Sequence, residues 1–247
     1  MRAAIVYKDS KLTEKVSKFL RSLEVESKIF EKPSFELEDF DFVVSIGGDG
    51  TILRILQYLR REVPIFGINV GRVGILTHSS PEDFEEKLRR AVLDFEIEKF
   101  QRISCETEEG ELIALNEIAV FSREVAKIMD AEIYVDGEPI ESLRCDGVIV
   151  ATPIGSTSYS LSAGGPIVDP HSEVIILNAV APFKLNWRPM IFKSDRKILI
   201  KAKGLAIADG QKRVDVEEVE IKRSKYMAVF FKKNRIREVF KKFKEII

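Results

Sequence analysis

Apolar and polar positions follow a strand and helix rhythm over the first 95 residues. Amphipathic helical spacing occurs after Ser10, at 51–61 and after Ser80, where apolar residues recur every three or four positions. Between these segments lie short continuous apolar runs, typical of strands buried on both faces of a parallel sheet, at 2–8, 41–46 and 64–69. This order predicts an α/β domain over residues 1–95 with a parallel, Rossmann-like sheet.

The pattern changes at Glu96 to short strands separated by turns. Gly, Asp and Pro separate these strands at regular intervals, which predicts a β-rich domain over residues 96–233. Helical spacing returns at the C-terminal end, through Ile236, Val239, Phe240, Phe243 and Ile246. We therefore expect a C-terminal helix at 234–247 that packs back on the first domain.

Composition and charge narrow the class of protein. The chain of 247 residues is 45% hydrophobic and 32% charged, with a formal net charge of −1, as in a folded globular protein that does not bind nucleic acid. No apolar run reaches the roughly 18 residues that span a bilayer, and no secretory signal is evident, so we expect a cytoplasmic protein without a membrane partner. Two cysteines and two histidines, all distant from one another, indicate neither a disulfide framework nor a metal site.

A glycine-rich turn joins an apolar strand to a helix at "VVSIGGDGTILR", residues 43–54. Backbone N–H groups and the helix dipole make such a turn an anion site, here formed by Gly47, Gly48, Gly50 and Thr51. Asp49 lies in its centre, and its carboxylate repels phosphate unless a metal ion or a cation offsets the charge. From the residues alone, two interpretations stay open: Asp49 caps the helix or turn, or it accepts the proton of a hydroxyl that attacks phosphate.

The "GGDGT" sequence resembles a group of nucleotide-dependent kinases that includes the NAD kinases, the diacylglycerol and sphingosine kinases and, with serine last, the 6-phosphofructokinases. Further segments are similar to the NAD kinase family in particular. They are "GINVGRVGIL" (67–76), "NEIAV" (116–120), "CDGVIVATPIGSTSYSLSAGGPIVDP" (145–170) and "DGQ" (209–211). The chain departs from the family pattern at Val73, Ile75, Ile154 and Ser158.

This resemblance implies an enzyme that phosphorylates the 2′-hydroxyl of the adenosine ribose of NAD with ATP or polyphosphate, giving NADP. It implies that Asp49 is the catalytic proton acceptor and that a divalent metal, expected to be Mg²⁺, binds through the donor phosphates. It also implies a homodimer or homotetramer whose NAD site includes residues of a neighbouring subunit. The NAD-binding residues that the resemblance implies are Asp49, Gly50, Arg54, Asn116, Glu117, Lys127, Arg144, Asp146, Thr157, Ser158, Tyr159, Ser160, Leu161, Ser162 and Gln211.

The chemistry of these side chains suits a dinucleotide, which offers hydroxyls, phosphates, an adenine edge and a carboxamide. Asn116 and Glu117 are suited to ribose or adenine groups, and Asp146 to the carboxamide. Hydroxyls, an aromatic face and backbone N–H groups follow Gly155. Two alternatives remain: a lipid kinase, which shares the "GGDGT" turn but gives no reason for the 146–162 segment, and a dinucleotide sensor that binds NAD(H) without transferring phosphate.

Overall fold

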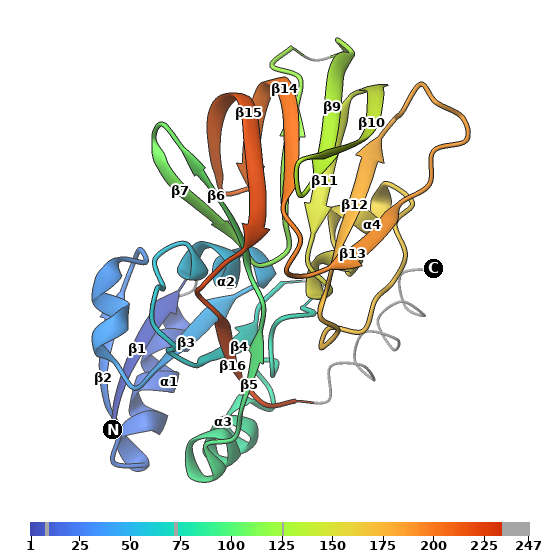
Figure 1. The fold of residues 1–247 in the computed structure, drawn as a ribbon. Helices are drawn as coiled ribbons and strands as arrows, with labels where there is room; N and C mark the ends of the chain where they lie inside the picture. The colour runs from blue at the N-terminus through green and yellow to red at the C-terminus, as the bar shows by residue number, and fades with distance from the viewer. Residues whose placement is uncertain (8–9, 72–73, 125, 234–247) are drawn as a thin grey trace. The chain divides into compact units, whose positions relative to one another are not determined.

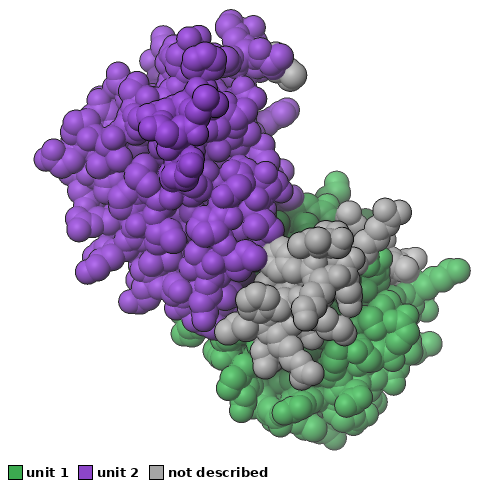
Figure 2. Space-filling model, turned by 90° about the vertical axis from the view of Figure 1, so that its right-hand side faces the viewer, with its two compact units in different colours: residues 1–99, 226–247 green, residues 100–225 purple. Residues whose placement is uncertain are grey.

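The computed structural model describes residues 1–7, 10–71, 74–124 and 126–233, which divide into two compact units. Unit 1 comprises Met1–Lys99 together with the chain from Tyr226 onward, and unit 2 comprises Phe100–Lys225. Figure 2 colours unit 1 green and unit 2 purple. Each unit has its own hydrophobic core. None of the described helices is both long and apolar enough to cross a lipid bilayer.

Unit 1 is an α/β layer structure in which helices accompany a parallel sheet (Figure 1). The strand order, among the residues described, is β2-β1-β3-β4-β16-β5, and β1 pairs in parallel with β2 and β3, as β4 does with β3 and β16. The predicted α/β class is therefore confirmed. The elements are β1 (Arg2–Tyr7), α1 (Ser10–Ser22), β2 (Glu26–Phe30), η1 (Phe35–Asp39), β3 (Phe42–Gly47), α2 (Asp49–Leu56), β4 (Ile65–Asn69), α3 (Phe84–Asp94), β5 (Ile97–Phe100) and β16 (Ala228–Phe231).

Two helices of unit 1 differ in length from the sequence prediction. α2 begins at Asp49 and ends at Leu56, whereas the spacing predicted a helix over 51–61. It stops early because the Glu38 carboxylate accepts the N–H groups of Arg60 and Arg61. α3 begins at Phe84 rather than just after Ser80, since Asp83 accepts hydrogen bonds from both the backbone and the hydroxyl of Ser80 in a preceding turn.

The predicted domain boundaries need correction at both ends of the second domain. Residues 96–233 were expected to form it, but β16 lies beside β4 in the sheet of unit 1, and β5 belongs to the same sheet. All four residues of β16 are buried, as expected for an interior parallel strand. The chain thus leaves unit 1, builds unit 2 and returns to unit 1. The predicted helix at 234–247 lies outside the described residues.

Unit 2 is built on a large antiparallel sheet, which confirms the predicted β-rich class. In the described part of the chain its order is β13-β12-β11-β8-β14-β15-β6-β7, with the β9–β10 hairpin joined through β14. The strands are β6 (Ile103–Thr107), β7 (Gly110–Ala114), β8 (Glu117–Phe121), β9 (Met129–Val135), β10 (Glu138–Cys145), β11 (Gly147–Ala151), β12 (Val174–Val180), β13 (Met190–Lys193), β14 (Ile198–Ala208) and β15 (Lys212–Arg223). Two short helical turns, η2 (Ile154–Thr157) and α4 (Tyr159–Ser162), follow β11.

Both cysteines lie in the core of unit 2 and are free. Burial raises the pKa of the Cys105 thiol to about 12 and that of Cys145 to about 11. A thiol with so high a pKa carries little thiolate at neutral pH and is a poor nucleophile. The two cysteines therefore act as small apolar residues of the core.

Candidate active site

Asp49 of unit 1 does not cap its own helix. The N-cap position of α2 is Gly48, and Asp49 is the first helical residue. Its two carboxylate oxygens accept hydrogen bonds from the backbone N–H groups of Ile75 (2.9 Å) and Leu76 (3.0 Å), 26 and 27 residues further along the chain. Each oxygen keeps a second lone pair, because a carboxylate has about four acceptor positions. The carboxylate is therefore fixed in orientation and still able to accept a proton or a hydrogen bond.

Polar side chains hold the described residues on either side of the Ile75 and Leu76 N–H groups. Asn69, at the end of β4, accepts a hydrogen bond from Gly71 N–H at 3.0 Å and donates to Gly71 C=O at 3.2 Å. The Thr77 hydroxyl donates to Gly74 C=O at 3.1 Å. Gly74 is required there, since a Cβ would lie 2.4 Å from Thr77 Oγ1 and 2.7 Å from Asn69 Nδ2. These contacts set the direction of the Ile75 and Leu76 N–H groups.

The glycine-rich turn follows the buried strand β3 and opens α2. A Cβ at Gly47 would lie 2.2 Å from Oγ1 of Thr51, so the turn closes only with glycine at this position. Gly50 has open space around its Cα and is exposed. Arg54, one turn into α2, donates to the Thr51 hydroxyl at 3.4 Å. The turn thus offers helix N-terminal N–H groups and one nearby guanidinium to an anion.

Glu117 in unit 2 is a buried carboxyl with a perturbed pKa. It is 7% exposed at the start of β8, and its Oε2 has no hydrogen-bond partner among the described residues. Burial, and after it the charge of Asp209, raise the pKa of Glu117 to about 7, against the effect of hydrogen bonds from the Ser158 hydroxyl and the Tyr159 N–H. The preceding residue, Asn116, donates from Nδ2 to Ser158 Oγ at 3.4 Å.

The segment after β11 completes this cluster of unit 2. Gly155 lets it approach the Asn116 backbone, because a Cβ there would lie 2.0 Å from the Asn116 carbonyl oxygen. The ring of Tyr159 is 39% exposed and stacks on Phe121, with centroids 5.7 Å apart. Ser160 is buried, and in the part of the chain that is described its hydroxyl has no partner. Thr157 and Leu161 are half-buried and Ser162 is exposed.

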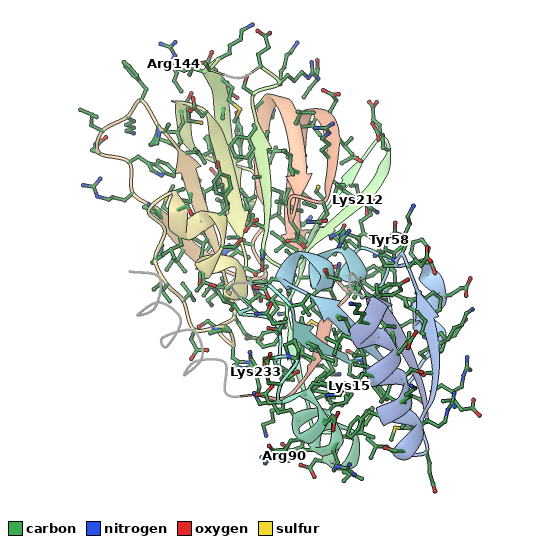
Figure 3. The ribbon with its side chains drawn as sticks, turned by 180° about the vertical axis from the view of Figure 1, so that it is seen from behind. Lys15, Tyr58, Arg90, Arg144, Lys212 and Lys233 are labelled. Atoms are coloured by element: carbon green, nitrogen blue, oxygen red, sulfur yellow. The ribbon has the colours of Figure 1, made fainter. Side chains whose placement is uncertain are left out.

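Three of the predicted residues lie at the other end of β11. Arg144 and Asp146 lie just before its first residue, Gly147, which pairs with Phe121, whereas Ala151 at its end pairs with Glu117. Arg144 lies 3.6 Å from the Asp130 carboxylate and 5.8 Å from the centroid of the Phe183 ring. Lys127 forms an ion pair with Glu124 at 2.8 Å. Figure 3 shows Arg144 at the opposite end of unit 2 from Lys212, which follows Gln211. The predicted residues of unit 2 thus form two groups: a first group around Glu117, made of Asn116, Glu117, residues 157–162 and Gln211, and a second group at the start of β11, made of Lys127, Arg144 and Asp146. Tyr159 of the first group reaches towards the second, since it stacks on Phe121, the partner of Gly147.

The sequence did not predict that Asp209 and Arg102 belong to the cluster around Asn116 and Glu117. Asp209 was placed only within the "DGQ" resemblance, and Asp-Gly between two strands is an ordinary hairpin signal. Here its carboxylate is buried and accepts N–H groups from Leu115, Asn116 and Glu117. Gln211, in contrast, is exposed and its Nε2 donates to Asp209 C=O at 3.2 Å. A buried arginine, Arg102, supplies the positive charge near Asp209.

These features define a class of protein: a two-domain nucleotide-dependent kinase of the "GGDGT" type, with an α/β unit and a β-rich unit. Comparison with known proteins is more specific. Residues 4–94 match the ATP-NAD kinase N-terminal domain and residues 115–232 match the ATP-NAD kinase C-terminal domain. The chain belongs to the NAD kinase family.

Individual relatives agree with this assignment. The NAD kinase of Archaeoglobus fulgidus is 53% identical over 249 residues, which cover 100% of both chains, and that of Methanothermobacter thermautotrophicus is 39% identical over 242 residues, covering 89% of this chain and 85% of the relative. A crystal structure of an NAD kinase from Archaeoglobus fulgidus in complex with ATP matches with a TM-score of 0.95 at 52% identity over 99% of each chain. Yeast NADH kinase complexed with NADH has the same fold, with a TM-score of 0.84 at 22% identity over 99% of this chain and 87% of that one.

Proposed function

We propose that the protein is an NAD kinase that transfers a phosphoryl group from ATP, or from another donor such as polyphosphate, to the 2′-hydroxyl of the adenosine ribose of NAD. The product is NADP. Full-length similarity to curated NAD kinases supports the reaction, and the similar structure that contains ATP supports the donor. The catalytic role of Asp49 is supported by one observation: two backbone N–H groups that are distant in sequence, those of Ile75 and Leu76, donate to its carboxylate and fix its orientation.

Asp49 is proposed to accept the proton of the attacking 2′-hydroxyl. In phosphoryl transfer the proton can leave late, so a correctly positioned carboxylate is sufficient even though it is a weak base. The fixed orientation of Asp49 contributes the positioning, because rotation about its side-chain bonds is restrained by Ile75 and Leu76. The reaction requires the ribose hydroxyl to come within hydrogen-bond reach of this carboxylate.

The turn formed by Gly47, Gly48, Gly50 and Thr51 is proposed to receive the donor phosphates. Its backbone N–H groups and the guanidinium of Arg54 are suited to anions. A divalent metal ion held mainly by phosphate oxygens is proposed here, because the Asp49 carboxylate beside the turn would otherwise repel the donor phosphates. Mg²⁺ is the proposed metal, and it would neutralise charge on the phosphates beside Asp49.

The first group of unit 2 is proposed to bind NAD. The buried Glu117 Oε2 lacks a donor, and a ribose hydroxyl is a donor of suitable chemistry. Asn116 offers an amide, Thr157, Ser158, Ser160 and Ser162 offer hydroxyls, and Tyr159 an exposed aromatic face beside Leu161. Gln211 is exposed beside the same cluster.

Self-association is proposed as the reason for the second group, Lys127, Arg144 and Asp146. These residues are exposed near the start of β11, and Arg144 lies against Phe183. Phe183 and Leu185, two residues further along, have exposed fractions of 72% and 97%. Phe183 N–H donates to Arg144 C=O at 2.8 Å, so the apolar and charged residues share one surface. Exposed apolar side chains of this size are typical of protein interfaces. The second group would then contact NAD bound to another copy of the chain, in a homodimer or homotetramer. The cytoplasm, where thiols remain reduced, is the proposed location and suits the free cysteines.

An assay of NADP formation tests the proposed function. Purified protein is incubated with NAD, ATP and MgCl₂, and NADP is measured with an NADP-specific dehydrogenase. Formation of NADP is the expected result. Binding of NAD by calorimetry without any NADP would favour the sensor alternative, and phosphorylation of diacylglycerol in place of NAD would favour the lipid kinase alternative.

A further inference from the structure

The carboxylate of Asp209 makes a set of backbone contacts that a hairpin turn does not need. It accepts the N–H groups of three consecutive residues, Leu115 at 2.8 Å, Asn116 at 2.7 Å and Glu117 at 3.3 Å. The Asp209 N–H in turn donates to Glu117 C=O at 3.0 Å. An aspartate in an Asp-Gly hairpin turn is usually at the surface, but Asp209 is 5% exposed.

Two of these three residues, Leu115 and Asn116, are held on their other side by Thr152. Its hydroxyl donates to Leu115 C=O at 2.5 Å, and its N–H donates to Asn116 C=O at 2.8 Å. The Thr152 hydroxyl also accepts Gly155 N–H at 3.1 Å, which joins this contact to the segment that carries Ser158. The backbone of 115–117 is therefore clamped between the end of β14 and the end of β11.

Charge makes the clamp specific to an ionised aspartate. Burial raises the pKa of Asp209 to about 6, while the three N–H groups and the nearby charge of Arg102, which is fully buried, act in the opposite direction. Asp209 is thus mainly ionised at pH 8 and acts as a true acceptor for all three donors. An amide side chain would turn an NH₂ group towards at least one of these N–H groups.

We propose that Asp209 is a positioning residue for NAD binding, which fixes the backbone of Leu115–Glu117 so that the Asn116 amide and the Glu117 carboxylate face the ligand. Asp209 itself is too buried to contact the dinucleotide. This inference rests on the proposed function, in that it takes Asn116 and Glu117 as NAD contacts. It adds a residue and a mechanism that neither the "GGDGT" turn nor the 146–162 segment contains.

The experiment compares Asp209→Asn with wild-type protein and with Asp215→Asn, an exposed aspartate on β15 whose ion pair is with Arg123. Asp209→Asn is expected to raise the KM and the Kd for NAD at least tenfold while the KM for ATP changes less than threefold. Asp215→Asn is expected to match wild type in all three. Equal NAD constants in Asp209→Asn and wild type would overturn the proposal. A joint loss of NAD and ATP binding by folded Asp209→Asn protein would overturn it as well.

A pH profile separates positioning from a merely structural role. The groups that face Glu117 are Asp209, with Arg102 behind it, and the Ser158 hydroxyl and Tyr159 N–H. Since the charge of Asp209 raises the pKa of Glu117, Asp209→Asn should shift the midpoint of NAD binding from near pH 7 to a lower pH. Asp209→Glu restores the charge but not the length, so it should keep the wild-type midpoint and still bind NAD weakly. An unchanged midpoint in Asp209→Asn contradicts the proposed arrangement.

If Asp209→Asn does not fold, Thr152→Val tests the other side of the clamp. It should raise the KM for NAD and leave the midpoint near pH 7, because the charge of Asp209 is retained; an unchanged KM would count against the proposal. The two hypotheses also fail separately. NAD binding that depends on Asp209 without any NADP formation refutes only the proposed function, whereas NADP formation with a wild-type KM in Asp209→Asn refutes only the positioning role.

Discussion

Replacing Glu117 with glutamine should make the protein more stable at alkaline pH and a weaker binder of NAD. Glu117 is buried, and its Oε2 lacks a hydrogen-bond partner in the described structure, which is unfavourable for a charged group. Glutamine has nearly the same shape and is neutral at every pH. The substitution thus removes the buried charge and keeps the packing.

The magnitude follows from the pKa of the carboxyl. Burial and the charge of Asp209 raise it from 4.5 to about 7 in the folded protein. A raised carboxyl pKa favours the folded state fully below the unfolded pKa, and this contribution is lost as the pH rises through about 7. Since one pKa unit corresponds to about 1.4 kcal/mol, the ionised Glu117 lowers the free energy of unfolding by about 3 kcal/mol at pH 8 and by less than about 1 kcal/mol at pH 5.

Urea unfolding at pH 5 and pH 8 measures this difference. Trp187, the single tryptophan of the sequence, is 9% exposed in unit 2, so its fluorescence reports on the unit that contains Glu117. Glu117→Gln should gain roughly 2 to 3 kcal/mol over wild type at pH 8 and little at pH 5, and its KM for NAD should rise about tenfold. The exposed Glu220→Gln on β15 serves as the control. Equal stability of wild type and Glu117→Gln at both pH values would refute the reasoning.

Three further predictions concern the turn, the surface and the metal. Gly47→Ala should destabilise unit 1 by about 1 to 3 kcal/mol, because the added Cβ would lie 2.2 Å from Thr51. Gly48→Ala is the control: its Cβ would have its nearest neighbour at 3.9 Å, so the loss of stability should be less than about 1 kcal/mol. Differential scanning calorimetry measures both. Leu185→Glu should shift an oligomer towards monomer in sedimentation velocity and leave unfolding unchanged, and an unaltered assembly state would exclude this surface as the interface. EDTA should abolish NADP formation and added Mg²⁺ should restore it, whereas full activity in EDTA would exclude the metal.

The fold could be predicted from local periodicity, but not the path of the chain. The run 42–47 is apolar apart from Ser45, and such a run is typical of a strand that a parallel sheet buries on both faces. The apolar run "AVFF" predicts a buried strand, but it does not show that this strand, β16, pairs with β4 in unit 1. Its pairing with β4 joins Phe230 to Ile65, which are 165 positions apart, and local pattern does not encode such a contact.

The candidate site could be predicted where the chemistry is local and not where it is assembled by the fold. Gly47 and Asp49 were found because a strand, a glycine-rich turn and a helix are adjacent in sequence. The Ile75 and Leu76 N–H groups that hold Asp49 could not be predicted, since nearly every residue type has a backbone N–H group and the sequence does not show which of them donates. Asp209 was overlooked for a related reason. The sequence Asp-Gly occurs both in exposed hairpin turns and in buried positions such as this one, and the sequence alone does not show that Asp209 is buried.

The central claim is that Asp49 takes the proton in the chemical step and contributes little to the affinity for NAD. The measurement is a comparison of Asp49→Asn with wild type, in which kcat is obtained from NADP formation and the Kd for NAD from calorimetry. The account predicts that kcat falls at least 100-fold, within the range for loss of a general base, while the Kd changes less than about threefold. A variant that forms NADP at a rate within a few-fold of wild type would contradict it.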